Sequence, residues 1–85
     1  MDISRQEQRV LHLLAQGGRI AVEKDDRGHI VEARCVTREG WMFSGCSLSL
    51  FRKLKRRRTI ASKGGGPYRI TELGLARVRS QPDNR

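Results

Sequence analysis

The side chains best suited to acid–base chemistry are spread along the whole chain. A nuclease needs a general acid and a general base, together with a cation that stabilises the charged phosphate intermediate. The candidate groups for these roles are Glu7, His12, His29, Glu39, Tyr68 and Arg69. The expected elements distribute them over one helix, two turns and a hairpin. We therefore predict that the protein is not an enzyme.

A metal site could in principle be formed by Cys35, Cys46 and His29. Structural zinc sites normally use paired ligands such as Cys-x-x-Cys, and this spacing does not occur in the sequence. Cysteine also behaves as a small apolar residue, so both cysteines are expected in the core as free thiols. The sequence thus predicts neither a metal nor any other cofactor.

Positive charge is concentrated in one region of the 85-residue chain. The formal net charge is +9, and residues 40–71 contain eight Lys or Arg and no Asp or Glu. Residues 1–39 contain seven basic and seven acidic residues and are neutral overall. Such a focused charge favours nucleic acid, an anionic membrane or an acidic protein face as the partner.

Length and hydropathy further limit the possible partners and the compartment of the protein. A chain of 85 residues is expected to form one domain. No apolar run approaches membrane-spanning length, and residues 1–4 lack the apolar core of a signal peptide. We therefore expect a cytoplasmic protein that has no membrane partner.

The first half of the chain predicts a helix followed by a three-stranded β-meander. Ser4 and Glu7 form a capping-box pattern at the start of a helix over residues 5–16. Its apolar side is expected to carry Val10, Leu11 and Leu14, with Ile3 one turn earlier, and to leave His12 solvated. Alternating patterns predict strands over residues 19–24, 29–36 and 41–43, joined by turns at 25–28 and 37–40.

The meander supplies part of the expected core. Val31, Ala33 and Cys35 alternate with polar residues and share one face of their strand. Trp41 and Phe43 are also expected inside, because a domain this small needs large buried side chains. The alternative is that these two aromatic residues form a platform on which nucleic-acid bases stack.

The second half predicts a basic helix, a hairpin and a final helix. The basic helix starts near Ser47, with Leu50, Phe51 and Leu54 on its core face. The hairpin has strands over residues 60–63 and 68–70 around the tip 64–67, which contains three consecutive glycines. Thr71 is expected to cap a helix over residues 72–80, whose apolar side would comprise Leu73, Leu75, Ala76 and Val78. Residues 81–85 are predicted to be a flexible tail.

This order predicts an α+β fold, namely a small winged-helix-like domain over residues 1–80 with an inserted β-meander and the order α-β-β-β-α-β-β-α. In a winged helix, the helix before the hairpin enters the major groove and the hairpin touches the flanking backbone. Arginine suits guanine edges and phosphates, and serine and lysine suit phosphates. The predicted partner-binding residues are therefore Ser49, Arg52, Lys53, Arg56 and Arg57 of the helix, with Lys63 and Arg69 of the hairpin.

Several short motifs are distributed along the chain, namely Ser4–Gln8 with Leu11 and His12, Arg38–Gly40, Phe51-x-Lys53-Leu54-Lys55, Pro67–Ile70, Val78–Arg79 and Asp83–Arg85. Together they resemble the YjhX-type toxin family of small bacterial proteins. The resemblance covers essentially the whole chain. It implies a toxin of a toxin–antitoxin pair, with a cognate antitoxin as partner and an inhibitory action against bacterial DNA topoisomerase I. It transfers no functional residues.

Two binding modes stay open on this basis. The protein could inhibit DNA topoisomerase I by a protein contact, in which the basic face meets an acidic patch or competes with DNA. Alternatively, it could bind duplex DNA directly and act as a transcriptional regulator. Both modes depend on the same cations. The simplest alternative to both is that these cations bind no partner and only keep one face of the domain hydrated.

Overall fold

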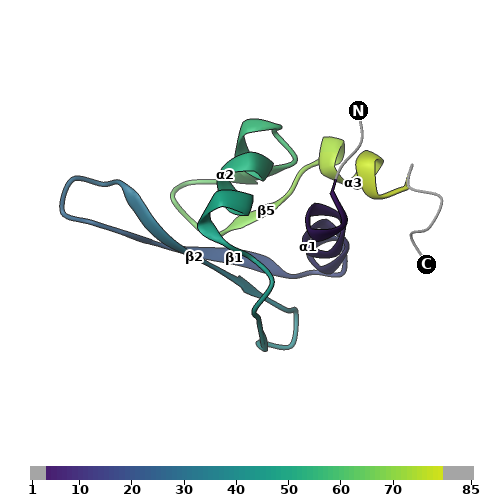
Figure 1. Ribbon diagram of the computed structural model, residues 1–85, viewed down its shortest axis with the longest axis horizontal. Helices are drawn as coiled ribbons and strands as arrows, with labels where there is room; N and C mark the ends of the chain where they lie inside the picture. Colours follow the sequence, from purple (N-terminus) through teal and green to yellow (C-terminus); the bar gives the residue numbers. More distant parts are fainter. Residues whose placement is uncertain (1–3, 80–85) are drawn as a thin grey trace.

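The computed structural model describes residues 4–79 and shows three helices and a five-stranded antiparallel sheet (Figure 1). The elements follow one another in the predicted order, α-β-β-β-α-β-β-α. Their bounds are α1 Arg5–Ala15, β1 Arg19–Lys24, β2 Ile30–Val36, β3 Met42–Phe43, α2 Leu48–Arg56, β4 Ile60–Ser62, β5 Tyr68–Ile70 and α3 Glu72–Arg79. The predicted apolar residue Ile3, the predicted end of the last helix at Ser80 and the predicted tail 81–85 lie outside the described residues.

The strands have the order β3-β2-β1-β5-β4, so the C-terminal hairpin joins the meander through β1. Ile20 of β1 pairs with Tyr68 of β5, and Cys35 of β2 pairs with Phe43 of β3. The β1–β2 hairpin is the longest pairing and extends away from the helices (Figure 1). The sheet therefore has the C-terminal hairpin at one edge and the short strand β3 at the other.

Local sequence explains where α1 and α2 begin and end. The Ser4 hydroxyl accepts a hydrogen bond from the Glu7 N–H, and the Glu7 carboxylate accepts one from the Ser4 N–H, which is the predicted capping box. The Ser47 hydroxyl caps α2 by accepting from the Leu50 N–H. Gly17, at a φ of 107°, ends α1 in a backbone conformation that glycine adopts without steric cost.

The core lies on one face of the sheet, where all three helices contribute to it. Its buried residues are Val10, Leu11, Leu14, Ile20, Ala33, Cys35, Leu50, Phe51, Leu54, Ile60 and Val78. The predicted core faces of the first two helices are therefore confirmed. The Phe51 and Tyr68 rings meet edge to face with centroids 4.9 Å apart, which fixes α2 against β5.

The prediction that Trp41 is a core residue is wrong, because 74% of its surface is exposed. Trp41 belongs to the turn before β3, and its backbone pairs with Thr37 across that turn. Strand β3 is only two residues long, so the sheet has nothing beyond it that could cover the indole. Phe43 is half-buried and packs against the core, as expected.

Other apolar positions also differ from the prediction. Val31 shares a face with Ala33 and Cys35 but is 54% exposed, since it lies on the part of the hairpin that extends past the helices. On α3, Leu73 and Ala76 are exposed, whereas Gly74 and Val78 are buried. No helix within residues 4–79 is long and apolar enough to cross a membrane.

Candidate partner-binding surface

Four exposed cations lie on the C-terminal half of α2 or directly after it. Arg52, Lys55 and Arg56 have the i, i+3, i+4 spacing of one helix face, and Arg58 follows the helix. All four are exposed, and none forms an ion pair within the described residues. We call these four residues the basic surface. Lys55 and Arg58 were not among the predicted site residues.

Lys53 and Arg57 were predicted for the same surface, but they point towards α1. The Lys53 Nζ lies 3.3 Å from Oε1 of Glu7. The Arg57 Nη1 lies 3.2 Å and 3.0 Å from the two oxygens of that carboxylate. Both side chains are therefore half-buried in a contact between α1 and α2, where one carboxylate balances part of their charge.

Glu7 is fully buried, with two cations around its carboxylate. Burial by itself raises the pKa of this carboxyl. The Ser4 N–H, Lys53 and Arg57 stabilise the ionised form more strongly, so the pKa of Glu7 is lowered overall. The carboxylate stays charged at neutral pH and holds α2 against α1.

Arg58 adopts a left-handed backbone conformation with a φ of 61°. Its N–H donates to the Lys55 carbonyl, and the Thr59 N–H donates to the Leu54 carbonyl, which together make a Schellman motif at the end of α2. Glycine is the usual residue at this position, and arginine pays a steric cost there. Backbone strain of this kind is common at functional sites, so the exposed guanidinium of Arg58 is a candidate for binding a partner.

The remaining predicted site residues occupy different surfaces. Ser49 is exposed on α2, one turn before Arg52. Lys63 is exposed at the beginning of the hairpin tip. Arg69 is exposed on the opposite face of the hairpin from α2, because its neighbour Tyr68 faces Phe51 and successive strand residues alternate. The structure thus groups Ser49, Arg52 and Arg56 but separates Arg69 from them.

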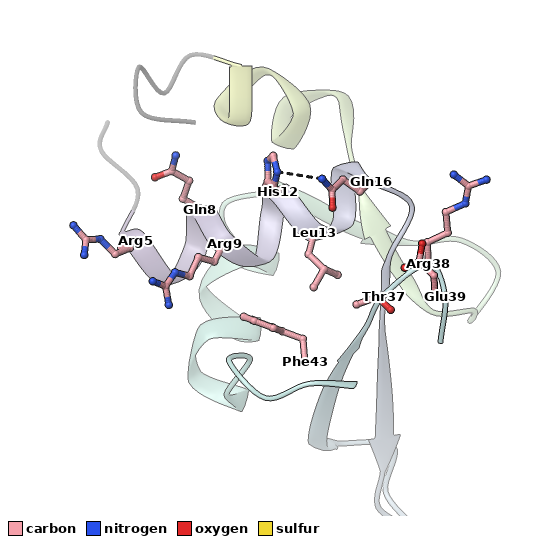
Figure 2. A pocket seen from close by; sticks show the side chains of 10 residues that line it. All are labelled: Arg5, Gln8, Arg9, His12, Leu13, Gln16, Thr37, Arg38, Glu39 and Phe43. Atoms are coloured by element: carbon pink, nitrogen blue, oxygen red, sulfur yellow. Dashed lines mark hydrogen bonds between the residues drawn. The ribbon is translucent and has the colours of Figure 1, made fainter. Parts of the chain in front are cut away.

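A second basic area, which the sequence analysis did not single out, surrounds the outer face of α1 (Figure 2). It is a groove of about 850 Å³ between α1, the turn after β2 and Phe43. We call it the α1 groove, and its lining comprises Arg5, Gln8, Arg9, His12, Leu13, Gln16, Thr37, Arg38, Glu39 and Phe43. The balanced charge of residues 1–39 concealed it, because the acids of that segment lie largely elsewhere in the fold.

His12 is half-buried beside the α1 groove rather than solvated as predicted. Its Nε2 lies 3.2 Å from the Gln16 side-chain nitrogen, and its Nδ1 is buried with no hydrogen-bond partner within the described residues. Glu39 lines the same groove, but its side chain lies at the far end from His12 (Figure 2). The structure therefore does not join these two residues into an acid–base pair.

The other candidate catalytic and metal-binding residues lie apart. The His29 ring lies 3.5 Å from the Asp25 carboxylate in the exposed β1–β2 turn. Within residues 4–79, no group of three or more His, Cys, Asp or Glu could hold a metal ion. Burial, with a smaller effect of Cys46, raises the pKa of the Cys35 thiol to about 12. Both thiols are free and pack in or against the core, as predicted.

Comparison of the sequence with known proteins identifies the family of the chain. A protein-family model described as "putative toxin of bacterial toxin-antitoxin pair" matches residues 1–85. The chain belongs to this YjhX toxin family. Its curated relatives include a protein of Chelativorans that is 66% identical over all of both chains, and a protein of Hyphomonas neptunium that is 64% identical over 99% of each.

A third relative of the YjhX toxin family, from Caulobacter vibrioides, is 59% identical and matches all of this chain over 93% of its own length. All three relatives carry the name UPF0386 protein. No solved structure matches the chain. Membership of the family confirms the resemblance noted from the sequence, and it implies an antitoxin as a partner.

Proposed function

We propose that this member of the YjhX toxin family acts by binding and not by catalysis, and that it inhibits bacterial DNA topoisomerase I through the basic surface. The family resemblance supplies the target. The observation that carries the binding role is the set of four exposed cations on and after α2. None of them forms an ion pair within the described residues, and Lys55 alone has a ring contact, with its Nζ 5.8 Å from the centroid of Tyr68. An enzyme that handles DNA offers two partners for them, an acidic patch or the DNA that it holds.

The strain at Arg58 supports a binding role for this surface. A glycine at its φ of 61° would end α2 at a lower steric cost. Arg52 and Arg56 also repel each other across one helix turn, which does not favour folding. An exposed cation held at a steric cost, beside two like charges one helix turn apart, suits an anionic partner that is bound after folding.

Direct binding of duplex DNA is the second candidate function, and the position of α2 before a hairpin favours it. In this variant of a winged helix, the face with Ser49, Arg52 and Arg56 enters the major groove and Lys63 of the hairpin contacts a phosphate. The meander β1–β3 occupies the place of the second helix of a standard winged helix. Such a protein would act as a transcriptional regulator.

One experiment tests both candidates with the same proteins. The variant Arg52→Ala/Arg56→Ala is compared with Arg5→Ala/Arg9→Ala, which removes the same charge from α1. Relaxation of supercoiled plasmid by DNA topoisomerase I and binding to a fluorescent DNA duplex are both measured. We expect the wild type and the α1 variant to inhibit relaxation, and the α2 variant to lose inhibition.

The DNA-binding measurement separates the two mechanisms. Direct binding predicts an affinity that falls steeply with salt, through release of about four to six counterions. Inhibition of relaxation without DNA binding at low salt would identify a protein contact as the mechanism. Wild-type protein that neither inhibits relaxation nor binds the duplex would contradict both candidates.

A further inference from the structure

The α1 groove combines positive charge with an apolar floor. Arg5 and Arg9 lie one turn apart on the exposed side of α1, and Arg38 comes from the turn after β2 (Figure 2). Leu13 and Phe43 lie between them and are half-buried, with their inner atoms packed against the core. Its volume of about 850 Å³ is within the range of sites that take up a ligand or several side chains.

The three arginines contribute nothing evident to the stability of the fold. None forms an ion pair with any residue that the structure describes. Arg5 and Arg9 are a like-charge i, i+4 pair, and they lie in the first half of α1, where the helix dipole disfavours cations. Their positions are explained more simply by an anionic group outside the chain.

The shape and lining of the groove select a protein segment over nucleic acid as the source of that anion. Duplex DNA presents a charged, convex backbone. Such a backbone would make no favourable apolar contact with Leu13 and Phe43. The amides of Gln8 and Gln16 can both donate to and accept from polar groups of a peptide.

We propose that the α1 groove binds an acidic, amphipathic segment of a partner protein, and that the cognate antitoxin implied by the family supplies it. Apolar side chains of the segment pack on Leu13 and Phe43, as in helix-in-groove recognition. Its carboxylates meet Arg5, Arg9 and Arg38, with which arginine makes paired hydrogen bonds. This proposal concerns a different surface from the proposed action on DNA topoisomerase I and does not depend on it.

Fluorescence anisotropy with a synthetic peptide tests the proposal. The probe is a fluorescein-labelled peptide of about 14 residues, long enough to form a helix, with Glu and Leu on one face at i, i+3, i+4 spacing. A second peptide has Gln in place of Glu, and a third has Ala in place of Leu. We expect the first peptide to bind, and each of the other two to bind at least about fivefold more weakly.

Two charge-reversed proteins locate the site. Arg5→Glu/Arg9→Glu and Arg52→Glu/Arg56→Glu change the net charge equally, so they separate a specific contact from general attraction to a chain of charge +9. We expect the α1 variant to bind the acidic peptide at least about tenfold more weakly and the α2 variant less than about threefold more weakly. Circular dichroism and thermal melting check that both variants fold.

Other outcomes would overturn the proposal. Equal weakening in the two variants would show only nonspecific attraction. Binding of a DNA duplex that is lost in Arg5→Glu/Arg9→Glu but kept in Arg52→Glu/Arg56→Glu would assign the groove to nucleic acid. Self-association that disappears in the α1 variant would assign it to a second copy of the chain, and absence of peptide binding to the folded wild type would exclude the site.

Discussion

The Nη1 of Arg57 lies 3.0 Å from Oε2 of Glu7, across the contact between α2 and α1. The same carboxylate caps the first turn of α1 by accepting from the Ser4 N–H. One buried side chain therefore stabilises a helix end and joins two helices that are 50 residues apart at this contact. This relationship makes two of the predicted surface cations structural and limits the basic surface to those that remain exposed.

Substitution Glu7→Gln should destabilise the protein by about 2 kcal/mol, because it removes the charge that compensates two cations at a buried contact. The loss of stability stays moderate, because the side chains of Lys53 and Arg57 are partly accessible to water. Urea unfolding followed by circular dichroism measures the effect. The control Glu72→Gln lies at an exposed position and should change stability by less than about 0.5 kcal/mol. Equal effects of the two substitutions would contradict a structural role for Glu7.

The lowered pKa of Glu7 predicts a dependence of stability on pH. The unfolded chain has an ordinary glutamate pKa of about 4.3 and binds this proton more readily than the folded protein does. The contribution of Glu7 is therefore fully present above about pH 4.3 and is lost as the pH falls through the lower folded value. The difference in unfolding free energy between wild type and Glu7→Gln should narrow over that range. A constant difference down to low pH would contradict this assignment.

Arg58→Gly should stabilise the protein by about 1 kcal/mol, since glycine removes the steric cost of the left-handed conformation. The same substitution should weaken the activity of the basic surface, because it deletes an exposed cation. Thermal unfolding and plasmid relaxation measure the two effects on one protein. The matched variant Arg58→Lys keeps both charge and strain and should leave stability unchanged. A drop in stability for Arg58→Gly would show that the guanidinium supports the fold.

Gly74→Ala should destabilise α3 by about 1–3 kcal/mol, although alanine is normally the better helix residue. A Cβ at this position would collide with the Thr59 carbonyl oxygen and lie 2.6 Å from Cγ1 of Ile70. Ala76→Gly on the exposed side of the same helix is the control, and helix propensity alone predicts a loss of about 1 kcal/mol there. Stabilisation by Gly74→Ala, measured by urea unfolding, would show that α3 packs less closely against the hairpin.

Trp41→Ala should change the unfolding free energy by less than about 0.5 kcal/mol, because the indole is largely exposed. Phe43→Ala is the contrasting variant, and it should cost about 2 kcal/mol since the half-buried ring packs against the core. Trp41 is the single tryptophan, so acrylamide quenching of its fluorescence reports its exposure directly. Strong protection from quenching in the folded protein would show that Trp41 is buried.

The order of the elements and the main helix faces followed from local patterns. The capping box at Ser4, the glycines after α1, and the apolar spacing of Leu50, Phe51 and Leu54 each act within a few residues, so the sequence displays them fully. The concentration of unbalanced charge in residues 40–71 is likewise visible in the sequence alone. These features determined an α+β domain with a basic helix before a hairpin.

Only the tertiary structure decided which of the charges are available to a partner. Pairing of Lys53 and Arg57 with Glu7 depends on the packing of α2 against α1, which no local pattern encodes. The same holds for Trp41, which the short edge strand leaves uncovered, and for Arg38, which the turn after β2 brings to the groove that Arg5 and Arg9 also line. Charge and burial depend on contacts between distant segments. The basic helix was therefore evident from the sequence, while its final binding face and the α1 groove depended on the fold.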